Sequence, residues 1–362
     1  MRILHLFSLL LLIPALTACG TLQYYSQSIS GQLSLLMKRE DIGDLIQDDK
    51  IDASTRQKLQ RVLTIRRFAS EQLQLPDNDS YTSYADLGRP FAVWNVFAAP
   101  ALSIKPKTWC FPVAGCVPYR GYFKREAALA YAKSLKAEGY DVYVGGISAY
   151  STLGWFDDPV LNTILKRPEP QLAGLLFHEL AHQKLYIKDD STFNESFATA
   201  VELEGVRRWL EQANNLDGFK KYQLRKQRQA QFIRLVMGTR DELAALYSSD
   251  KPDAEKIKHK PLIFSSMRQR YAELKKQWND NSYDGWFKRA LNNARIATIG
   301  TYHDHVPAFQ TMLAEAKGDM AVFYADVEKL SRHDKKQRDK ILAAKSRNNK
   351  PQIKRMVLLD KQ

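Results

Sequence analysis

Apolar residues recur every three to four positions in several long segments of the chain, which is the spacing of one face of an α-helix. Between residues 54 and 73, for example, Leu59, Val62 and Leu63 alternate with lysines and arginines. This pattern predicts helices over Tyr24–Met37, Ser54–Leu73, Arg125–Glu138, about 217–246, about 261–278 and 306–330. Most of the chain is therefore expected to be helical.

A shorter region has the composition of β-strands. Phe91–Phe97, Tyr119–Phe123 and Asp141–Ile147 are rich in aromatic and β-branched residues, which favour the extended backbone of a sheet. These segments lie directly before the most apolar of the helical segments. The overall pattern predicts a mostly α-helical α+β fold with a small β-sheet before that helix.

The helix after the predicted sheet carries the most informative motif. It is expected to begin near Pro170, because proline favours the first turn of a helix, and it contains His178-Glu179-Leu180-Ala181-His182 in an apolar stretch. Positions i and i+4 share one helix face, so both histidines can direct a ring nitrogen at one ion, with Glu179 beside them. This spacing predicts a metal site of the kind found in zinc hydrolases.

A third ligand is expected from the following helix, over Asn194–Leu210, for which Asn194 is a suitable cap. A short connection through Lys188–Ser191 allows the two helices to lie antiparallel, which brings Glu195 back toward the histidines. Glu202, seven residues further along, is on roughly the same face. It is either the rival ligand or a partner that orients a histidine.

One zinc ion per chain is the cofactor that this donor set predicts. His178, His182 and Glu195 would leave a fourth position open for water, as catalytic zinc sites do. Glu179 would then accept a proton from that water and pass it to the leaving group. The alternative is a pair of core histidines beside a buried ion pair.

Composition allows a large, basic, folded protein. The chain has 362 residues, of which 44% are hydrophobic, so it can bury a core without a metal or disulfide. The net charge of +14 predicts affinity for anionic surfaces, but no finger, helix-turn-helix or RNP-like signature points to nucleic acid. The basic tail over 331–362 could contact anionic lipid; a solvated, frayed end is its simpler interpretation.

The first twenty residues predict a place in the cell envelope. Arg2 and the apolar run Ile3–Leu16 lead to Leu16-Thr17-Ala18-Cys19, which resembles a bacterial lipobox. Residues 1–18 would be removed as a lipoprotein signal peptide, and Cys19 would carry the lipid anchor. Gly20 follows the cysteine, which favours the outer membrane on its periplasmic side.

The two remaining cysteines, Cys110 and Cys116, form an even pair in a chain predicted to be exported, and such a pair predicts a disulfide. Reduced thiols packed in the core are the alternative. After removal of residues 1–18, residues 19–362 are expected to form one catalytic domain. Its expected parts are helical over 19–90, α+β with the metal site over 91–210, helical over 211–330 and a basic tail over 331–362.

Several blocks of the chain resemble a known family. They are Leu75–Asn78, Trp109–Pro112, Tyr119–Phe123, Ala149–Phe156, His178–His182, Phe193–Glu195, Asn292–Ala294, Tyr302 and Val306–Phe309. Together they resemble the bacterial family of putative zinc-dependent aminopeptidase lipoproteins. The block Asn194-Glu195-Ser196-Phe197-Ala198 is also similar to the N-E-G-F-A block of gluzincin aminopeptidases, although the gap after the second histidine is shorter here.

The resemblance implies a zincin-like core and zinc-dependent hydrolysis of a peptide substrate. Gluzincins take the hydrogen-bond donor for the oxyanion from a Tyr or His downstream of the metal helices. In this chain Tyr302 is the candidate for that role, with His303 and His305 as alternates. Tyr150 is a further candidate if the strand before the metal helix passes beside the metal.

Cleavage from the amino end has weaker support. The G-x-M-E-N segment that binds the substrate amine in classical aminopeptidases does not occur before His178. Asp157, Asp158 or Glu202 could replace it, since an ammonium group needs a carboxylate partner. An endopeptidase acting on cell-wall peptides fits equally well. For either kind of peptidase, Val142–Tyr150 is the candidate strand whose free edge would pair with an extended substrate. A binding or scaffold lipoprotein with a structural or inactive metal site is the remaining alternative.

Overall fold

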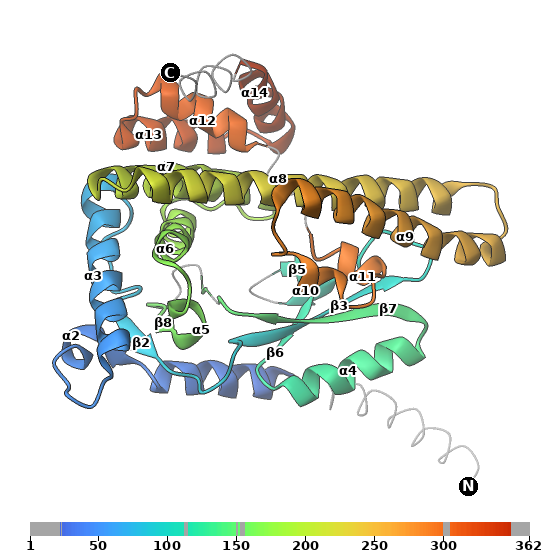
Figure 1. The fold of residues 1–362 in the computed structure, drawn as a ribbon, viewed down its shortest axis with the longest axis horizontal. Coiled ribbons are helices and arrows are strands. Elements are labelled where there is room, and N and C mark those ends of the chain that lie inside the picture. The colour runs from blue at the N-terminus through green and yellow to red at the C-terminus, as the bar shows by residue number, and fades with distance from the viewer. Residues whose placement is uncertain are drawn as a thin grey trace, which may run out of the picture.

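The computed structural model describes residues 22, 24–111, 115–149, 151–152, 156–299 and 305–348. The predicted lipidation at Cys19 and the predicted role of Tyr302 lie outside the described residues, as do those of Tyr150 and His303. Within the described part the chain is a mostly helical α+β protein, as the sequence predicts (Figure 1).

The strands are short and few compared with the helices. They are β1 (Glu40–Asp41), β2 (Ser83–Ala85), β3 (Val93–Pro100), β4 (Trp109–Phe111), β5 (Gly115–Val117), β6 (Arg120–Tyr122), β7 (Tyr140–Ile147) and β8 (Val160–Leu161). A first helix covers residues 24–37. It is followed by α2 (Ile42–Leu45), α3 (Ala53–Leu73), α4 (Arg125–Ala137), α5 (Asn162–Leu165), α6 (Glu169–Lys184), α7 (Ser191–Gln212), α8 (Leu216–Ser248), α9 (Asp253–Trp278), α10 (Asp284–Phe287), α11 (Asn293–Ile296), α12 (Val306–Glu315), α13 (Met320–Ser331) and α14 (Lys335–Asn348).

The largest sheet is antiparallel and has the strand order β6-β3-β7, so β7 lies at one edge among the described strands. Its register places Asn95 of β3 opposite Gly121 on one side and Gly145 on the other. Helix α4 lies on one face of this sheet and α11 on the other (Figure 1). The second sheet, β1-β2-β8, and the pair β4-β5 are smaller.

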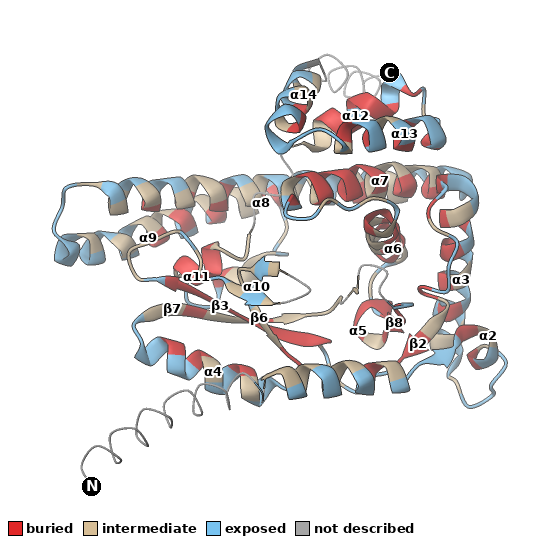
Figure 2. Ribbon diagram, turned by 180° about the vertical axis from the view of Figure 1, so that it is seen from behind, coloured by how far each residue is buried: buried red, intermediate tan, exposed pale blue. Residues whose placement is uncertain are grey.

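Helices α6 and α7 lie at the centre of the main apolar core. Residues of α3, α6, α7, α12 and α13 share one buried hydrophobic cluster, and Figure 2 shows buried residues around most of α6. A helix that is apolar on every side has to be enclosed by other elements. A second cluster fills the space between α8 and α9.

The helix that carries Glu195 begins earlier than predicted. Its first residue is Ser191, and Asp190, not Asn194, is its cap, since the Asp190 carboxylate accepts the N–H of Phe193. Asn194 instead closes the connection between α6 and α7. Its side chain accepts from the N–H of Ile187 at 2.8 Å and donates to the carbonyl of the same residue at 2.7 Å.

Two boundaries in the C-terminal half also differ from the prediction. The helix expected near 261 begins at Asp253, and Pro261 lies within it, because its first turns are too polar to show an apolar period. The single helix expected over 306–330 is divided into α12 and α13. Lys317 and Gly318 have φ values of 54° and 80°, a left-handed conformation that ends α12, and Asp319 caps α13.

The basic tail is not a frayed end where the structure describes it. Residues Lys335–Asn348 form α14, which packs against α12. Arg338 is only 6% exposed, and its guanidinium pairs with the buried carboxylate of Asp190 at 2.6 Å. The prediction of a solvated end was wrong for this segment because Asp190, far away in the sequence, supplies a buried partner for the charge.

Two further features concern the exported state that the sequence predicts. Cys110 and Cys116 are joined in a disulfide that links β4 to β5. None of the helices in the described part of the chain is long and apolar enough to span a bilayer.

Candidate metal centre

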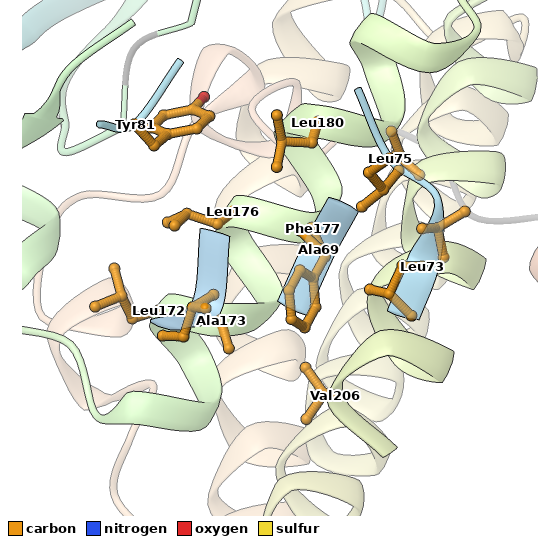
Figure 3. Packing of buried hydrophobic residues seen from close by; sticks show 14 of the residues in the cluster. Ala69, Leu73, Leu75, Tyr81, Leu172, Ala173, Leu176, Phe177, Leu180 and Val206 are labelled. Atoms are coloured by element: carbon orange, nitrogen blue, oxygen red, sulfur yellow. The ribbon is translucent and has the colours of Figure 1, made fainter. Parts of the chain in front are cut away.

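Helix α6 presents its polar motif from an otherwise apolar body. It begins at Glu169 with Pro170 in its first turn, as the sequence predicts. Figure 3 shows Leu172, Leu176 and Leu180 along one side of the helix, with Phe177 turned toward Ala69 and Leu73 of α3. All of these side chains are buried. Their packing fixes the rotation of α6, and therefore the direction in which the histidines point.

The next helix returns alongside α6 and brings the third acidic side chain to the histidines. The Nε2 atoms of His178 and His182 are 3.1 Å apart. The Glu195 carboxylate oxygens lie 3.3 Å from Nε2 of His178 and 3.5 Å from Nε2 of His182. The structure thus brings together the three residues that the sequence proposes as ligands, with one donor atom from each within 4.8 Å of the others.

These distances match the donor set that zinc requires. A tetrahedral ion with bonds of about 2.0–2.2 Å keeps its ligand atoms about 3.3–3.6 Å apart. The observed separations of 3.1, 3.3 and 3.5 Å are close to those edges. Two imidazoles and a carboxylate are also the ligand types that zinc prefers. His178, His182 and Glu195 could therefore hold such an ion with little rearrangement.

Glu202 lies on the far side of His178 from Glu195. Its carboxylate is 3.4 Å from Nδ1 of His178, whereas Glu195 faces Nε2. Tyr222 and Lys226, both on α8, contact the other Glu202 oxygen at 2.6 and 2.5 Å. Of the two roles that the sequence left open for Glu202, this geometry fits the partner that orients a histidine.

The carboxylates favour positive charge at this position. Burial alone would lower the pKa of His178, but hydrogen bonds to Glu195 and Glu202 raise it to about 10. Burial and the positive charge of His178 lower the pKa of His182 to about 4. Without a metal, one charged and one neutral imidazole share the site. This is the electrostatic surrounding that a buried cation needs.

Glu179 is the acidic residue of the motif that remains available for proton transfer. Burial is the main cause that raises its pKa, and the nearby Glu195 adds to the effect, while positive His178 and a hydrogen bond with Ser151 oppose it. A carboxylate with a raised pKa is a better proton acceptor near neutral pH than an exposed one. Its surroundings suit the general base that the motif predicts.

Tyr81 is a residue that the sequence analysis missed. Its ring packs beside Leu176 and Leu180 of α6, and its hydroxyl points away from Leu176 (Figure 3). The hydroxyl is buried and has no hydrogen bond of ordinary geometry among the described residues, although it interacts with the side chain of Ser151. Burial raises its pKa well above the usual value, and the charges of Glu179 and Asp158 raise it further. The Tyr81 hydroxyl is therefore a protonated donor in the neighbourhood of Glu179.

The backbone at Tyr81 is held in an unfavourable conformation. Its φ of 66° is rare for a bulky side chain, and such strain persists only where the surroundings enforce it. The N–H of Tyr81 donates to the carbonyl of Asp158 at 2.7 Å. Buried Arg66 of α3 donates to the carbonyl of Ser80 at 3.0 Å, and Gln183 of α6 donates to the Ser80 hydroxyl at 3.2 Å. The loop is thus tied to the metal helix itself.

The predicted partners for a substrate amine are already engaged or face solvent. Buried Asp158 accepts hydrogen bonds from Ser151 and from both the N–H and the hydroxyl of Thr152. Glu202 is bound to Lys226, and Asp157 is exposed. Among these three, the structure identifies no carboxylate dedicated to an ammonium group.

His305, an alternate oxyanion donor, is turned toward α14. Its Nε2 lies 3.4 Å from Asp339, and its backbone N–H donates to the Ser196 hydroxyl at 3.2 Å. Ser196 is the residue after Glu195 on α7, so the backbone of His305 lies near the metal site. Its imidazole ring nevertheless contacts Asp339 of α14.

The chain matches one known protein family over most of its length. A family model described as putative aminopeptidase matches residues 23–342, which is most of the chain and includes α6 and α7. The chain belongs to this family. Searches of curated proteins and of solved structures returned no match.

Membership of the putative aminopeptidase family agrees with the resemblance seen in the sequence and indicates a peptidase. The match includes the loop at Tyr81 and helix α8, which carries Tyr222 and Lys226. No sequence spacing connects Tyr81, Tyr222 or Lys226 to the histidine motif, because they reach it from separate elements. For Tyr81 the one local signal was its place in the turn-rich segment Asp77–Tyr81. Tyr222 and Lys226 had no such signal.

Proposed function

We propose that this protein is a zinc-dependent peptidase with a zincin-like core, acting as an aminopeptidase in the cell envelope. One observation carries the proposal: three donor atoms from His178, His182 and Glu195 converge at the separations that a tetrahedral ion requires. Family membership supports peptide hydrolysis. A bound zinc ion would supply a Lewis acid for the scissile carbonyl and would acidify a water molecule.

The chain's own residues supply the proton transfers. Glu179 accepts a proton from the attacking water and delivers it to the leaving nitrogen. Its carboxyl group must therefore be able to exist in both the charged and the protonated form near neutral pH. Glu202 accepts a hydrogen bond from the Nδ1–H of His178, which keeps the proton on Nδ1 and leaves Nε2 available for a metal. Lys226 and Tyr222 hold Glu202 in place.

The developing negative charge on the carbonyl oxygen needs a hydrogen-bond donor. The Tyr81 hydroxyl supports this role, because it is buried, remains protonated and is close enough to Glu179 for the charge of that carboxylate to raise its pKa. Tyr302, for which the sequence suggests this role, is the second candidate for the same hydrogen bond. A preorganised donor of this type contributes about 2.7–4 kcal/mol to transition-state stabilisation.

The substrate is proposed to lie along β7. Among the described strands β7 pairs with β3 alone, and its C-terminal end runs toward α6 (Figure 1). An extended peptide could add to the open edge by main-chain hydrogen bonds. The side-chain amide of Asn292 already donates a hydrogen bond to the carbonyl of Val142. A substrate would therefore pair with β7 residues that follow Val142.

A Glu179→Gln variant tests the proposal. The purified protein should hold about one zinc per chain, and the variant should keep the metal while peptide turnover falls by about a hundredfold or more. Glu169→Gln, on the same helix but paired with Arg61 and Trp209, is the matched control and should turn over normally. Unchanged turnover in Glu179→Gln would contradict the assignment.

Substrate panels separate the narrower possibilities. Aminoacyl reporter substrates should be cleaved by an aminopeptidase, whereas quenched internal peptides should be cleaved by an endopeptidase that acts on cell-wall peptides. A binding or scaffold lipoprotein with a structural metal is the second candidate. It would cleave neither class, and metal removal would lower its melting temperature alone.

The proposed location depends on Cys19. With residues 1–18 removed and Cys19 acylated, the protein would be tethered to the outer membrane on its periplasmic side. Cys19→Ala should then move the protein from the membrane fraction to the soluble fraction, while Cys116→Ala should not. Equal distribution of the Cys19→Ala variant and the wild type would exclude the lipid anchor.

A further inference from the structure

A large cavity lies apart from the metal centre, between the helix over residues 24–37 and the segment that contains β6 and the start of α4. Its volume is about 990 Å³, and its lining includes none of the histidine or glutamate residues of the metal site. Figure 1 shows α4 on the opposite side of the β6-β3-β7 sheet from α9 and α11. The cavity is within the usual size range for small-molecule sites.

The wall of the cavity is strongly basic. Lys38, Arg89, Arg120 and Lys124 all contribute to it, and no aspartate or glutamate occurs among its described lining residues. Two of these cations are engaged with the backbone. Arg89 donates to the carbonyls of Phe123 and Ala92, and Lys38 donates to the carbonyl of Asp86. The positive charge of the wall is therefore not neutralised by a side chain that faces the cavity.

Arg120 is the most informative of the four. Its guanidinium lies 4.0 Å from the ring centre of Tyr24 and 4.7 Å from that of Tyr131. Among the described residues no hydrogen bond or ion pair to its side chain is formed, and its Nε atom is buried without a partner. A buried donor left unsatisfied is costly. The rings hold the guanidinium in one place, with its fork available to a planar or tetrahedral anion.

The rest of the lining is mixed: polar side chains of the first helix, Ser26, Gln27, Ser30 and Ser34, lie beside apolar and aromatic groups. Leu35, Leu87 and Phe123 join the rings of Tyr24 and Tyr131 around the basic groups. The helix 24–37 is seated close to this wall, because a Cβ added at Gly31 would lie 2.1 Å from the Phe123 ring. A simple inorganic anion would leave most of this volume and apolar surface unused.

We propose that the cavity binds an amphipathic anion, in which a phosphate or carboxylate head contacts Arg120 and Lys124 and an apolar body lies against the aromatic wall. An acidic phospholipid is the source that we would test first. Cys19, where the sequence predicts a lipid anchor, precedes Tyr24 by five residues, a span of at most about 18 Å. The cavity would then lie within reach of the membrane surface. This inference does not depend on the proposed peptidase activity.

The test is calorimetric titration of the full-length purified protein with soluble dihexanoyl-phosphatidylglycerol. Its zwitterionic counterpart, dihexanoyl-phosphatidylcholine, and inorganic phosphate are titrated separately. The phosphatidylglycerol should bind more tightly than either. Arg120→Gln should weaken that binding by about tenfold or more, the usual loss for one charge-assisted hydrogen bond. Arg125→Gln is the matched control, since Arg125 is exposed on α4 and does not line the cavity.

The outcomes separate the parts of the proposal. Equal affinity of the wild type and Arg120→Gln for phosphatidylglycerol would overturn it, as would an equal loss in Arg125→Gln. Equal binding of phosphatidylcholine would exclude recognition of the anion. Inorganic phosphate binding as tightly as the lipid would exclude the apolar contact. Lys124→Gln, which alters an exposed side chain, repeats the comparison without disturbing the packing of Arg120 and should also weaken binding.

Discussion

Substitution of Glu202 by glutamine keeps the size of the side chain but removes its charge. In the wild type, one Glu202 oxygen faces Nδ1 of His178 at 3.4 Å, and the other accepts from Tyr222 and Lys226. The glutamine amide has a single acceptor oxygen and adds two donors. It cannot satisfy both Lys226 and the Nδ1–H of His178. The imidazole would then lose the hydrogen bond that holds its proton on Nδ1 and directs Nε2 toward the proposed metal.

The size of the expected loss can be estimated from this geometry. Removal of a carboxylate behind a metal-binding histidine typically costs about 10–100-fold in metal affinity, which is about 1.4–2.7 kcal/mol. The Nδ1 to oxygen separation of 3.4 Å is longer than the roughly 2.7–2.9 Å of a strong charge-assisted hydrogen bond. We therefore expect metal affinity to fall by about tenfold. In the wild type Glu202 is charged: burial would raise its pKa, but Lys226 and His178 lower it to about 2.

The measurement is the zinc dissociation constant, obtained by competition with a chromophoric chelator at neutral pH. Glu204→Gln is the control, because Glu204 lies on the same helix and is similarly buried but pairs with Arg207 and Arg208 instead of a histidine. It should lose stability and keep its zinc affinity. A Glu202→Gln dissociation constant within about twofold of the wild type, or an equal loss in Glu204→Gln, would refute the assigned role.

Three further outcomes are expected. Tyr81→Phe should lower kcat by about a hundredfold or more with little change in KM or zinc content, because it removes only the hydroxyl that would contact the oxyanion; steady-state kinetics with a peptide reporter would show it, and an unchanged kcat would leave the role to Tyr302. Arg338→Gln should lower the free energy of unfolding by about 3–5 kcal/mol, since it breaks a buried ion pair. Burial opposes the charge of Asp190, but hydrogen bonds from Arg338 and Lys335 keep the pKa of this carboxyl below its usual value; the difference in melting temperature between variant and wild type should therefore be full above about pH 4 and shrink as the pH falls further. Removal of the disulfide by Cys110→Ser should cost about 2 kcal/mol, because the loop it closes is short, and calorimetry with and without reductant would measure it.

Features encoded over a few residues could be predicted from the sequence alone. The i, i+4 spacing of His178 and His182 requires only that α6 be a helix, and its apolar flanks make that helix buried. Glu195 follows after a short connection, so antiparallel packing of α6 and α7 was the simplest geometry, and the structure brings the three side chains together. The mostly helical α+β fold follows from the same local periodicities.

Tertiary structure alone decided which residues surround those three. Lys226 reaches Glu202 from α8, and Tyr81 reaches the neighbourhood of Glu179 from a strained loop held by Arg66. Arg338 turns a basic tail into a packed helix by pairing with Asp190, 148 residues away in the sequence. The physical reason is the range of the interactions. Periodicity and caps depend on neighbours within a helical turn, whereas a buried charge is stable only beside a partner that folding brings to it.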